Sequence, residues 1–266
     1  LGLVLFLLCF AGTKERVKPP ADQQVTLRGS FASLWQNDQW RILCVAAFFL
    51  LTGMVLKNTL AIYYVKYYLL REDLITTFMT LGMLGNIAGC AVAQWLSRYV
   101  DKVKAYIGLQ LISAAICIGS FFIGPDQLWL AFAFYIAWCF FLQMATPLLW
   151  AKMADTVDYG HYKTGIRITG LVYSSIVFFI KLGLALGGAM AGWLLAYYGY
   201  QADAAQTAGT QHGILLSFTV LPALGSVLVA FTMRYYRLTG ERVLDIHQQL
   251  ASQSGETAAE HAKVPA

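Results

Sequence analysis

Charged residues are scarce in this sequence. Asp, Glu, Lys and Arg make up 12% of the 266 residues, about half the share of a typical soluble domain, in which roughly 25% are charged. Hydrophobic residues make up 58% of the chain. With so few charged residues, the chain cannot cover the surface of a folded domain of this size with groups that bind water. The composition therefore excludes an ordinary water-soluble protein and indicates that lipid is the solvent for much of the chain.

Acidic residues are absent from the interiors of the long apolar runs. Six runs have roughly the 20 residues that cross a bilayer as a helix. They cover 42–65, 74–97, 105–124, 128–151, 168–199 and 213–233. Because a segment in lipid must satisfy its own backbone polar groups, each run is predicted to be a helix. The predicted fold class is an all-α polytopic membrane protein.

Motifs of metal and enzyme chemistry are also missing. The five cysteines lie inside apolar runs and none forms a C-x-x-C pair, so the sequence indicates neither a disulfide framework nor a zinc site. It contains no P-loop, dinucleotide fingerprint or H-x-x-E-H motif. We therefore expect no metal site, no resident cofactor and no enzyme activity. A membrane-embedded enzyme acting on lipid-linked substrates stays open as the least favoured alternative.

Lys and Arg are distributed unevenly between the apolar runs. Fifteen of the nineteen lie at 14–41, 98–104, 152–167 and 234–263. If the helices alternate, these four segments share one side of the membrane, and the opposite loops hold only Lys66 and Arg71. Because basic residues are retained on the cytoplasmic side, the linker and the C-terminus are predicted to be cytoplasmic.

The chain opens within an apolar run, LGLVLFLLCF, without a preceding basic region or a following cleavage motif. This is unlike a signal peptide, and we expect residues 1–12 to be the end of a transmembrane helix from a preceding N-terminal half. Residues 13–40 are expected to form a cytoplasmic linker, residues 41–236 a six-helix transmembrane bundle, and residues 237–266 a cytoplasmic tail. Two helix groups joined by a long linker are typical of two-bundle transporters.

Lys181 places a positive charge in the middle of an apolar run. It lies 13 residues after Ile168, where the run begins, and therefore about 20 Å along a helix. A lysine at mid-bilayer costs at least roughly 2.5–3.5 kcal/mol, and the other runs hold no acid to pair with it. Water in a cavity, a substrate oxygen or an acid outside this chain would have to face it. We therefore interpret Lys181 as a candidate substrate-binding residue.

Lys57 is a second lysine inside a run, nearer its external end. Asn58 follows it, and Tyr64 falls on the same helix face seven residues later. A cation, polar groups and an aromatic ring suit a polyhydroxylated ligand, so all three are candidate substrate contacts. Two alternatives stay open: Lys57 snorkels to the surface, and the tyrosines form an interfacial belt.

Pro147 lies inside the fourth run. A proline removes one helix hydrogen bond, so we expect a kink below Gln143. Gln143 is a further candidate substrate contact.

Glycines four residues apart mark expected close contacts between helices, because small residues let backbones approach and slide. The pairs are Gly85 and Gly89, Gly183 and Gly187, and Gly188 and Gly192.

The segment 154–192 resembles one family of proteins. It reads ADTVDYGHYKTGIRITGLVYSSIVFFIKLGLALGGAMAG, in which D-T-V-D-Y-G and K-x-G-x-R precede a lysine fourteen residues after the arginine and a glycine-rich stretch. The later run MRYYRLTGERVLDIHQQL echoes the same family's tail. From the linker onward, the chain resembles the C-terminal half of the glycoside–pentoside–hexuronide:cation symporters, the melibiose-permease type within the major facilitator superfamily.

The resemblance implies cation-coupled symport of a sugar or glycoside by alternating access across the bacterial inner membrane. It implies that Lys181 lines the central cavity. It also implies a charged cytoplasmic network that closes the inner gate, formed by Asp155, Asp158, Lys163 and Arg167.

The expected partners are a small sugar or glycoside, a coupling Na⁺ or H⁺, the lipid bilayer and the N-terminal six-helix bundle of the same protein, which would hold most of the cation site. No nucleic acid is expected. The identity of the sugar stays open between neutral, uronate and sulfonated kinds. A major-facilitator exporter of another small solute is the main alternative to symport.

Overall fold

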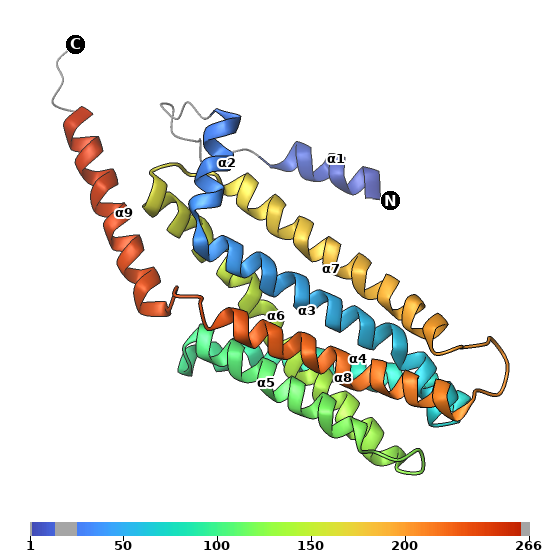
Figure 1. Ribbon diagram of the computed structural model, residues 1–266. Coiled ribbons are helices and arrows are strands. Elements are labelled where there is room, and N and C mark those ends of the chain that lie inside the picture. The colour runs from blue at the N-terminus through green and yellow to red at the C-terminus, as the bar shows by residue number, and fades with distance from the viewer. Residues whose placement is uncertain (1, 14–25, 262–266) are drawn as a thin grey trace.

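The computed structural model describes residues 2–13 and 26–261 (Figure 1). Within these ranges the secondary structure is entirely helical. The elements are α1 Gly2–Gly12, α2 Leu27–Gln36, α3 Asp38–Tyr63, a π-helical turn Tyr64–Tyr68, a short 3-10 turn Glu72–Leu74, α4 Ile75–Tyr99, α5 Lys102–Phe121, α6 Leu128–Thr164, α7 Thr169–Tyr197, α8 Ala208–Met233 and α9 Gly240–His261. In this part of the chain six helices are long and apolar enough to cross a membrane. The predicted fold class is confirmed.

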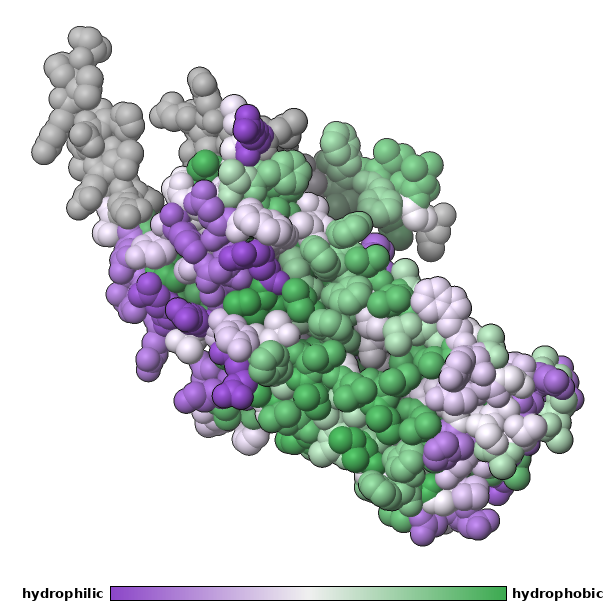
Figure 2. All heavy atoms as spheres, viewed as in Figure 1, coloured by the Kyte–Doolittle hydropathy of each residue, from purple (hydrophilic) through white to green (hydrophobic). Residues whose placement is uncertain are grey.

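The spanning helices pack side by side in an order that differs from their order in the chain. α3 packs between α7 and α8, α5 packs between α8 and α6, and α4 packs along α6 (Figure 1). On the face shown in Figure 2, a broad hydrophobic belt crosses the middle of the bundle, with hydrophilic residues at both ends. The belt is the surface that a bilayer would cover.

Glycines set the contact between α7 and α3, as the sequence predicts. A Cβ atom on Gly183 would lie 2.5 Å from the carbonyl oxygen of Phe48, and one on Gly187 would lie 2.6 Å from that of Thr52. Both distances are too short for any side chain, so the two backbones touch. Four residues further along α7, the contact lies four residues further along α3. The two helices therefore run parallel.

The contact between α4 and α6 has the same origin. A Cβ atom on Gly85 would lie 2.8 Å from the carbonyl oxygen of Ile136, and one on Gly89 would overlap the backbone of Phe140. The third predicted pair, Gly188 and Gly192, differs, because neither position has a neighbouring atom within 4 Å.

α6 is longer than predicted. The sequence places a loop at 152–167, but the helix continues from Leu128 to Thr164 and ends at Gly165, whose φ of 70° is the left-handed conformation typical of a helix C-terminus. The reason is tertiary: the extension buries Met153, Thr156 and Val157 against the rest of the molecule. The polar residues on the exposed side of this segment lower its average hydropathy, so the sequence alone did not indicate a helix with one buried face.

α9 is joined to the bundle by a shared cap. Asp101 precedes α5 and accepts hydrogen bonds from the backbone N–H groups of Val103 and Lys104, while its other oxygen accepts one from Gly240 at the start of α9. Partial burial raises the pKa of Asp101, but the three N–H groups outweigh it and hold the pKa below its usual range. One carboxylate therefore stabilises the N-termini of two helices.

The expected linker is partly helical. α2 lies within residues 13–40 and begins at the N-cap Thr26, whereas residues 14–25 and 262–266 lie outside the described residues.

Candidate substrate and gate residues

Lys57 is enclosed inside the bundle. Its side chain is 1% exposed, and its ammonium donates a hydrogen bond of 3.1 Å to the carbonyl oxygen of Phe218 in α8. The same ammonium lies 3.8 Å from the centre of the Phe218 ring and 5.1 Å from that of Trp138. Ring faces carry negative charge that attracts a cation. Lys57 therefore does not snorkel in this structure.

A proline explains why this carbonyl is free to accept the bond. Within a helix, the carbonyl of Phe218 would receive the N–H of residue 222, but that residue is Pro222 and has none. α3 approaches α8 closely here, because a Cβ atom on Gly53 would lie 3.6 Å from the carbonyl oxygen of Pro222. Lys57 thus supplies the donor that the proline removed.

Tyr64 and Asn58 join the same cluster. The ring of Tyr64 stacks on Phe218 with 4.3 Å between centroids, so Lys57 and Tyr64 meet through one phenylalanine. Asn58 is half-buried and accepts a hydrogen bond of 3.4 Å from the hydroxyl of Tyr135. The structure therefore brings the three predicted contacts together, with Lys57 and Tyr64 fully packed by protein.

Gln143 lies in α6, four residues before Pro147, and its side chain is half-buried. It forms no hydrogen bond with the described residues. Pro147 lies inside the continuous helix α6, which removes the hydrogen bond that the Gln143 carbonyl would normally accept.

Lys181 is placed quite differently from Lys57. It is exposed on α7 and forms neither an ion pair nor a hydrogen bond with the described part of the chain. The same face of α7 continues with three more exposed residues, Ala185, Gly188 and Gly192. This face lies opposite the glycines that touch α3. α7 therefore has one face closed by α3 and one open face with a single positive charge.

The two lysines do not meet. Because Gly183 packs against Phe48 and α7 runs parallel to α3, Lys181 lies at about the level of Phe48. Lys57 comes nine residues later in α3, about 14 Å further along the helix.

Two of the predicted gate residues form an ion pair. Asp158 of α6 lies 3.3 Å from the guanidinium of Arg167, which follows the end of α6. Its second oxygen lies 3.0 Å from the Nε2 atom of His247 in α9. Asp158 thus links α6 both to the segment that follows it and to α9, 89 residues further along the chain.

Lys163 pairs with a residue that the sequence did not single out. Its ammonium lies 2.5 Å from Asp38, the first residue of α3, and the hydroxyl of Tyr159 donates to the same carboxylate at 2.9 Å. Asp155 forms no ion pair with the described residues. The predicted network is therefore two separate ion pairs and one unpaired acid.

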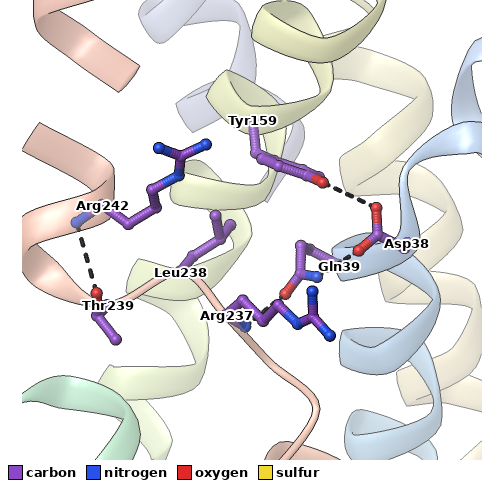
Figure 3. Close-up of a pocket in the computed structure, with 7 residues that line it drawn as sticks. All are labelled: Asp38, Gln39, Tyr159, Arg237, Leu238, Thr239 and Arg242. Atoms are coloured by element: carbon purple, nitrogen blue, oxygen red, sulfur yellow. Dashed lines mark hydrogen bonds between the residues drawn. The ribbon is translucent and has the colours of Figure 1, made fainter. Parts of the chain in front are cut away.

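A cavity of about 390 Å³ lies beside these pairs, between the starts of α3 and α9 (Figure 3). Its lining residues are Asp38, Gln39, Tyr159, Arg237, Leu238, Thr239 and Arg242. The side chain of Gln39 accepts a hydrogen bond of 2.7 Å from the backbone N–H of Arg237, so the connection between α8 and α9 is attached to α3. Any widening of the cavity between α3 and α9 would therefore displace the segment that connects α8 to α9.

Sequence reasoning missed Asp38, His247 and Lys152. Asp38 is 125 residues from its partner Lys163. His247 is 89 residues from Asp158, and Lys152 is 50 residues from Lys102, and no spacing rule applies over such separations. Lys152 is 1% exposed and donates a hydrogen bond of 3.0 Å to the carbonyl of Lys102. The one signal in the sequence was that Lys152 directly follows the apolar run 128–151.

Comparison with known families decides where this chain belongs. The model of the family described as MFS/sugar transport protein matches residues 1–240. The chain belongs to this family. Its membership confirms the resemblance drawn from the 154–192 motifs, and the chain is a multi-pass membrane protein of the major facilitator type.

Members of the family in Escherichia coli K12 are similar over almost the whole chain. The inner membrane symporter YicJ is 36% identical over 94% of this chain and 55% of its own length. The putative glycoside/cation symporter YagG is 32% identical over 94% of this chain and 54% of its own. The chain therefore spans about half the length of these relatives.

A solved structure shares the fold. The major facilitator transporter FucP, crystallised in the outward conformation, has a TM-score of 0.61 to this chain at 18% identity, over 88% of this chain and 52% of FucP. The six-helix arrangement is thus that of half a major facilitator protein.

Proposed function

We propose that the full-length protein containing this chain is a secondary active transporter that couples uptake of a sugar or glycoside to a cation. The observation that carries the proposal is the exposed ammonium of Lys181 in the middle of α7, which pairs with none of the described residues. A charge at this depth is tolerated only beside water or a polar partner. The family description and the names of the two relatives support a sugar as that partner.

Lys181 suits a sugar because an ammonium donates three hydrogen bonds and a sugar presents many hydroxyl acceptors. The proposal assigns Lys181 to the central cavity between this bundle and an N-terminal bundle of the same protein. Lys57, Asn58, Tyr64 and Gln143 are proposed to shape that site from behind, since they lie in the packed interior or half-buried.

The gate proposal rests on the two ion pairs of α6. Both are partly exposed: the side chains of Arg167 and Asp158 are 48% and 21% exposed, and those of Lys163 and Asp38 are 40% and 35% exposed. Exposed pairs contribute only roughly 0–1 kcal/mol each. Such contacts within one bundle are weak enough to be exchanged for contacts with an opposite bundle when the gate closes. Together with the unpaired Asp155, this suits Asp158, Lys163 and Arg167 to a cytoplasmic gate.

The same proposal orients the chain in the bacterial inner membrane. Segments 13–40 and 237–266 would lie in the cytoplasm, and residues 41–236 would form the C-terminal bundle. Residues 1–12 would end the last helix of the N-terminal bundle. The coupling Na⁺ or H⁺ would bind mainly in that bundle.

The test is cation flux in proteoliposomes that contain the full-length protein. Neutral glycosides, uronates and sulfonated sugars are added outside in turn, and Na⁺ and H⁺ entry is measured with ion-sensitive dyes. We expect one class of sugar to drive entry of one cation, and an imposed cation gradient to accumulate that sugar. Absence of sugar-dependent cation entry for every class, with export of a solute instead, would establish the exporter alternative.

A further inference from the structure

The inner face of α5 holds an unusual line of buried polar groups. Tyr106, Gln110, Ser113 and Cys117 follow one another at spacings of four, three and four residues, which places them on one side of a helix. Each is 0% exposed. The line runs about 16 Å, at 1.5 Å per residue, along the surface that α5 presents to its neighbours α6 and α8.

Four polar atoms on this line have no hydrogen-bond partner within the described part of the chain. The Tyr106 hydroxyl, both side-chain heteroatoms of Gln110 and the Ser113 hydroxyl make no hydrogen bond there. Buried polar atoms are normally paired, because an unpaired one keeps the full cost of leaving water. Four such atoms in succession on one helix face are therefore not explained by packing.

Both ends of the line meet a buried lysine. At the α9 end, the ammonium of Lys152 lies 4.8 Å from the centre of the Tyr106 ring. At the other end, Cys117 lies beside the ammonium of Lys57. The line thus connects two cations that are each 1% exposed.

Two more unpaired buried atoms belong to rings beside Lys57 or its partner Phe218. They are the hydroxyl of Tyr64, whose ring stacks on Phe218, and the indole nitrogen of Trp138, whose ring faces Lys57. Six of the eight unpaired atoms in the described residues therefore belong to the line on α5 or to the surroundings of Lys57.

We propose that the inner face of α5 binds a file of water molecules that runs from Lys152 to Lys57. Water is the ligand that both donates and accepts, as the amide of Gln110 and the hydroxyls of Tyr106 and Ser113 require. A buried water typically makes about three hydrogen bonds to groups that would otherwise be unpaired. The file also solvates Lys57, whose ammonium has one carbonyl and two rings but no acid beside it.

This site is distinct from the substrate cavity of the proposed function. It lies inside one six-helix bundle, between α5, α6 and α8, whereas Lys181 is exposed on α7. Its existence does not depend on which solute the protein carries.

The test is hydroxyl-radical labelling by X-ray radiolysis of the full-length protein in detergent, read by mass spectrometry. Radicals formed from bound water modify side chains next to that water even when they are buried. Two residues that are also buried, each at most 3% exposed, serve as internal controls: Cys44 for Cys117, and Tyr236, whose hydroxyl is paired with Thr156, for Tyr106. We expect Cys117 and Tyr106 to be labelled severalfold faster than their controls. Equal protection of both members of each pair would overturn the proposal.

A variant provides a second, independent readout. Gln110→Met keeps the volume of the side chain and removes both polar atoms. With water present, labelling of Cys117 falls to that of Cys44 and the melting temperature drops, because the water loses its partners. With a dry interior, the melting temperature rises, because an unpaired amide has been removed, and that rise would refute the water file. Ile112→Met, at an exposed position of α5, is the matched control and leaves the labelling of Cys117 unchanged.

Discussion

The ammonium of Lys57 in α3 donates a hydrogen bond to the carbonyl oxygen of Phe218 in α8. This is the carbonyl that Pro222 leaves without a helical N–H donor. The two residues are 161 positions apart in the sequence, yet each accounts for the other. The proline removes one backbone hydrogen bond of α8 at a place where the Lys57 ammonium of α3 can reach the free carbonyl. The lysine in turn gains an acceptor in a part of the structure where none of the described residues is a buried acid. Polar groups in lipid are retained when a neighbouring helix satisfies them.

This relationship predicts an energetic coupling between Lys57 and Pro222. Lys57→Met leaves the Phe218 carbonyl unpaired and should destabilise the protein by about 1–3 kcal/mol. In a Pro222→Ala background the alanine N–H pairs with that carbonyl, so the same substitution should cost about 1 kcal/mol less. Thermal unfolding of the four proteins in detergent measures this difference. Additive effects of the two substitutions would contradict it.

The glycine pairs of α7 predict opposite responses to the same substitution. Gly183→Ala places a methyl group 2.5 Å from a backbone oxygen of α3 and should cost about 1–3 kcal/mol of stability, as overpacking typically does. Gly188→Ala meets no atom within 4 Å and should leave stability unchanged or raise it slightly, since alanine favours a helix. Melting temperatures of the two variants provide the comparison. Equal destabilisation would show that α7 does not pack on α3 in this way.

The proposed role of Lys181 predicts a loss of transport without a loss of folding. A hydrogen bond from a charged group is worth about 1.5–3 kcal/mol, so Lys181→Ala should weaken sugar binding about ten- to hundredfold. Coupled uptake falls while membrane insertion and melting temperature stay unchanged, because the side chain is exposed. Leu182→Ala, also exposed on α7, is the control. Undiminished accumulation of sugar by Lys181→Ala would reject the role.

The pair between Asp158 and Arg167 predicts rescue by exchange of charges. Asp158→Arg alone replaces the attractive pair with two guanidinium groups that repel each other, and should impair uptake. Combining it with Arg167→Asp restores an attractive pair and should recover a large part of the activity. The effect on stability is expected to be small, roughly 0–1 kcal/mol, since the pair is partly exposed. Transport rates of the single and double variants test this, and no recovery in the double variant would argue against a gate contact.

Asp101 predicts how the attachment of α9 depends on pH. Its pKa lies below the usual range in the folded protein, so its contribution is complete above the unfolded pKa, about 3.9, and is lost as the pH falls through the folded value. We expect α9 to loosen from α5 in acid. Spin labels at the exposed positions Lys104 and Leu244 would report a broader distance distribution below about pH 4. In Asp101→Asn the distribution should be broad at every pH, because the amide has one acceptor oxygen and cannot accept bonds from both α5 and Gly240.

The sequence by itself determined the spanning helices, because each must bury about 20 apolar residues and satisfy its own backbone. All six predicted runs overlap the observed spanning helices. Glycine spacing was enough to predict that Gly183 and Gly85 lie at close helix contacts, but not that their partners are α3 and α6. It was not enough to distinguish Gly188, since a glycine has the same local effect whether or not a second helix lies against it.

Only the tertiary structure decided what surrounds each polar residue. Lys57 and Lys181 look alike as lysines in apolar runs, yet one is enclosed by Phe218 and Trp138 and the other is exposed. Likewise, the extension of α6 to Thr164 depends on partners that bury its inner face. The physical reason is that hydropathy is a property of a segment, whereas burial and pairing depend on which helices lie beside it, and the packing order of these helices is not their order in the chain.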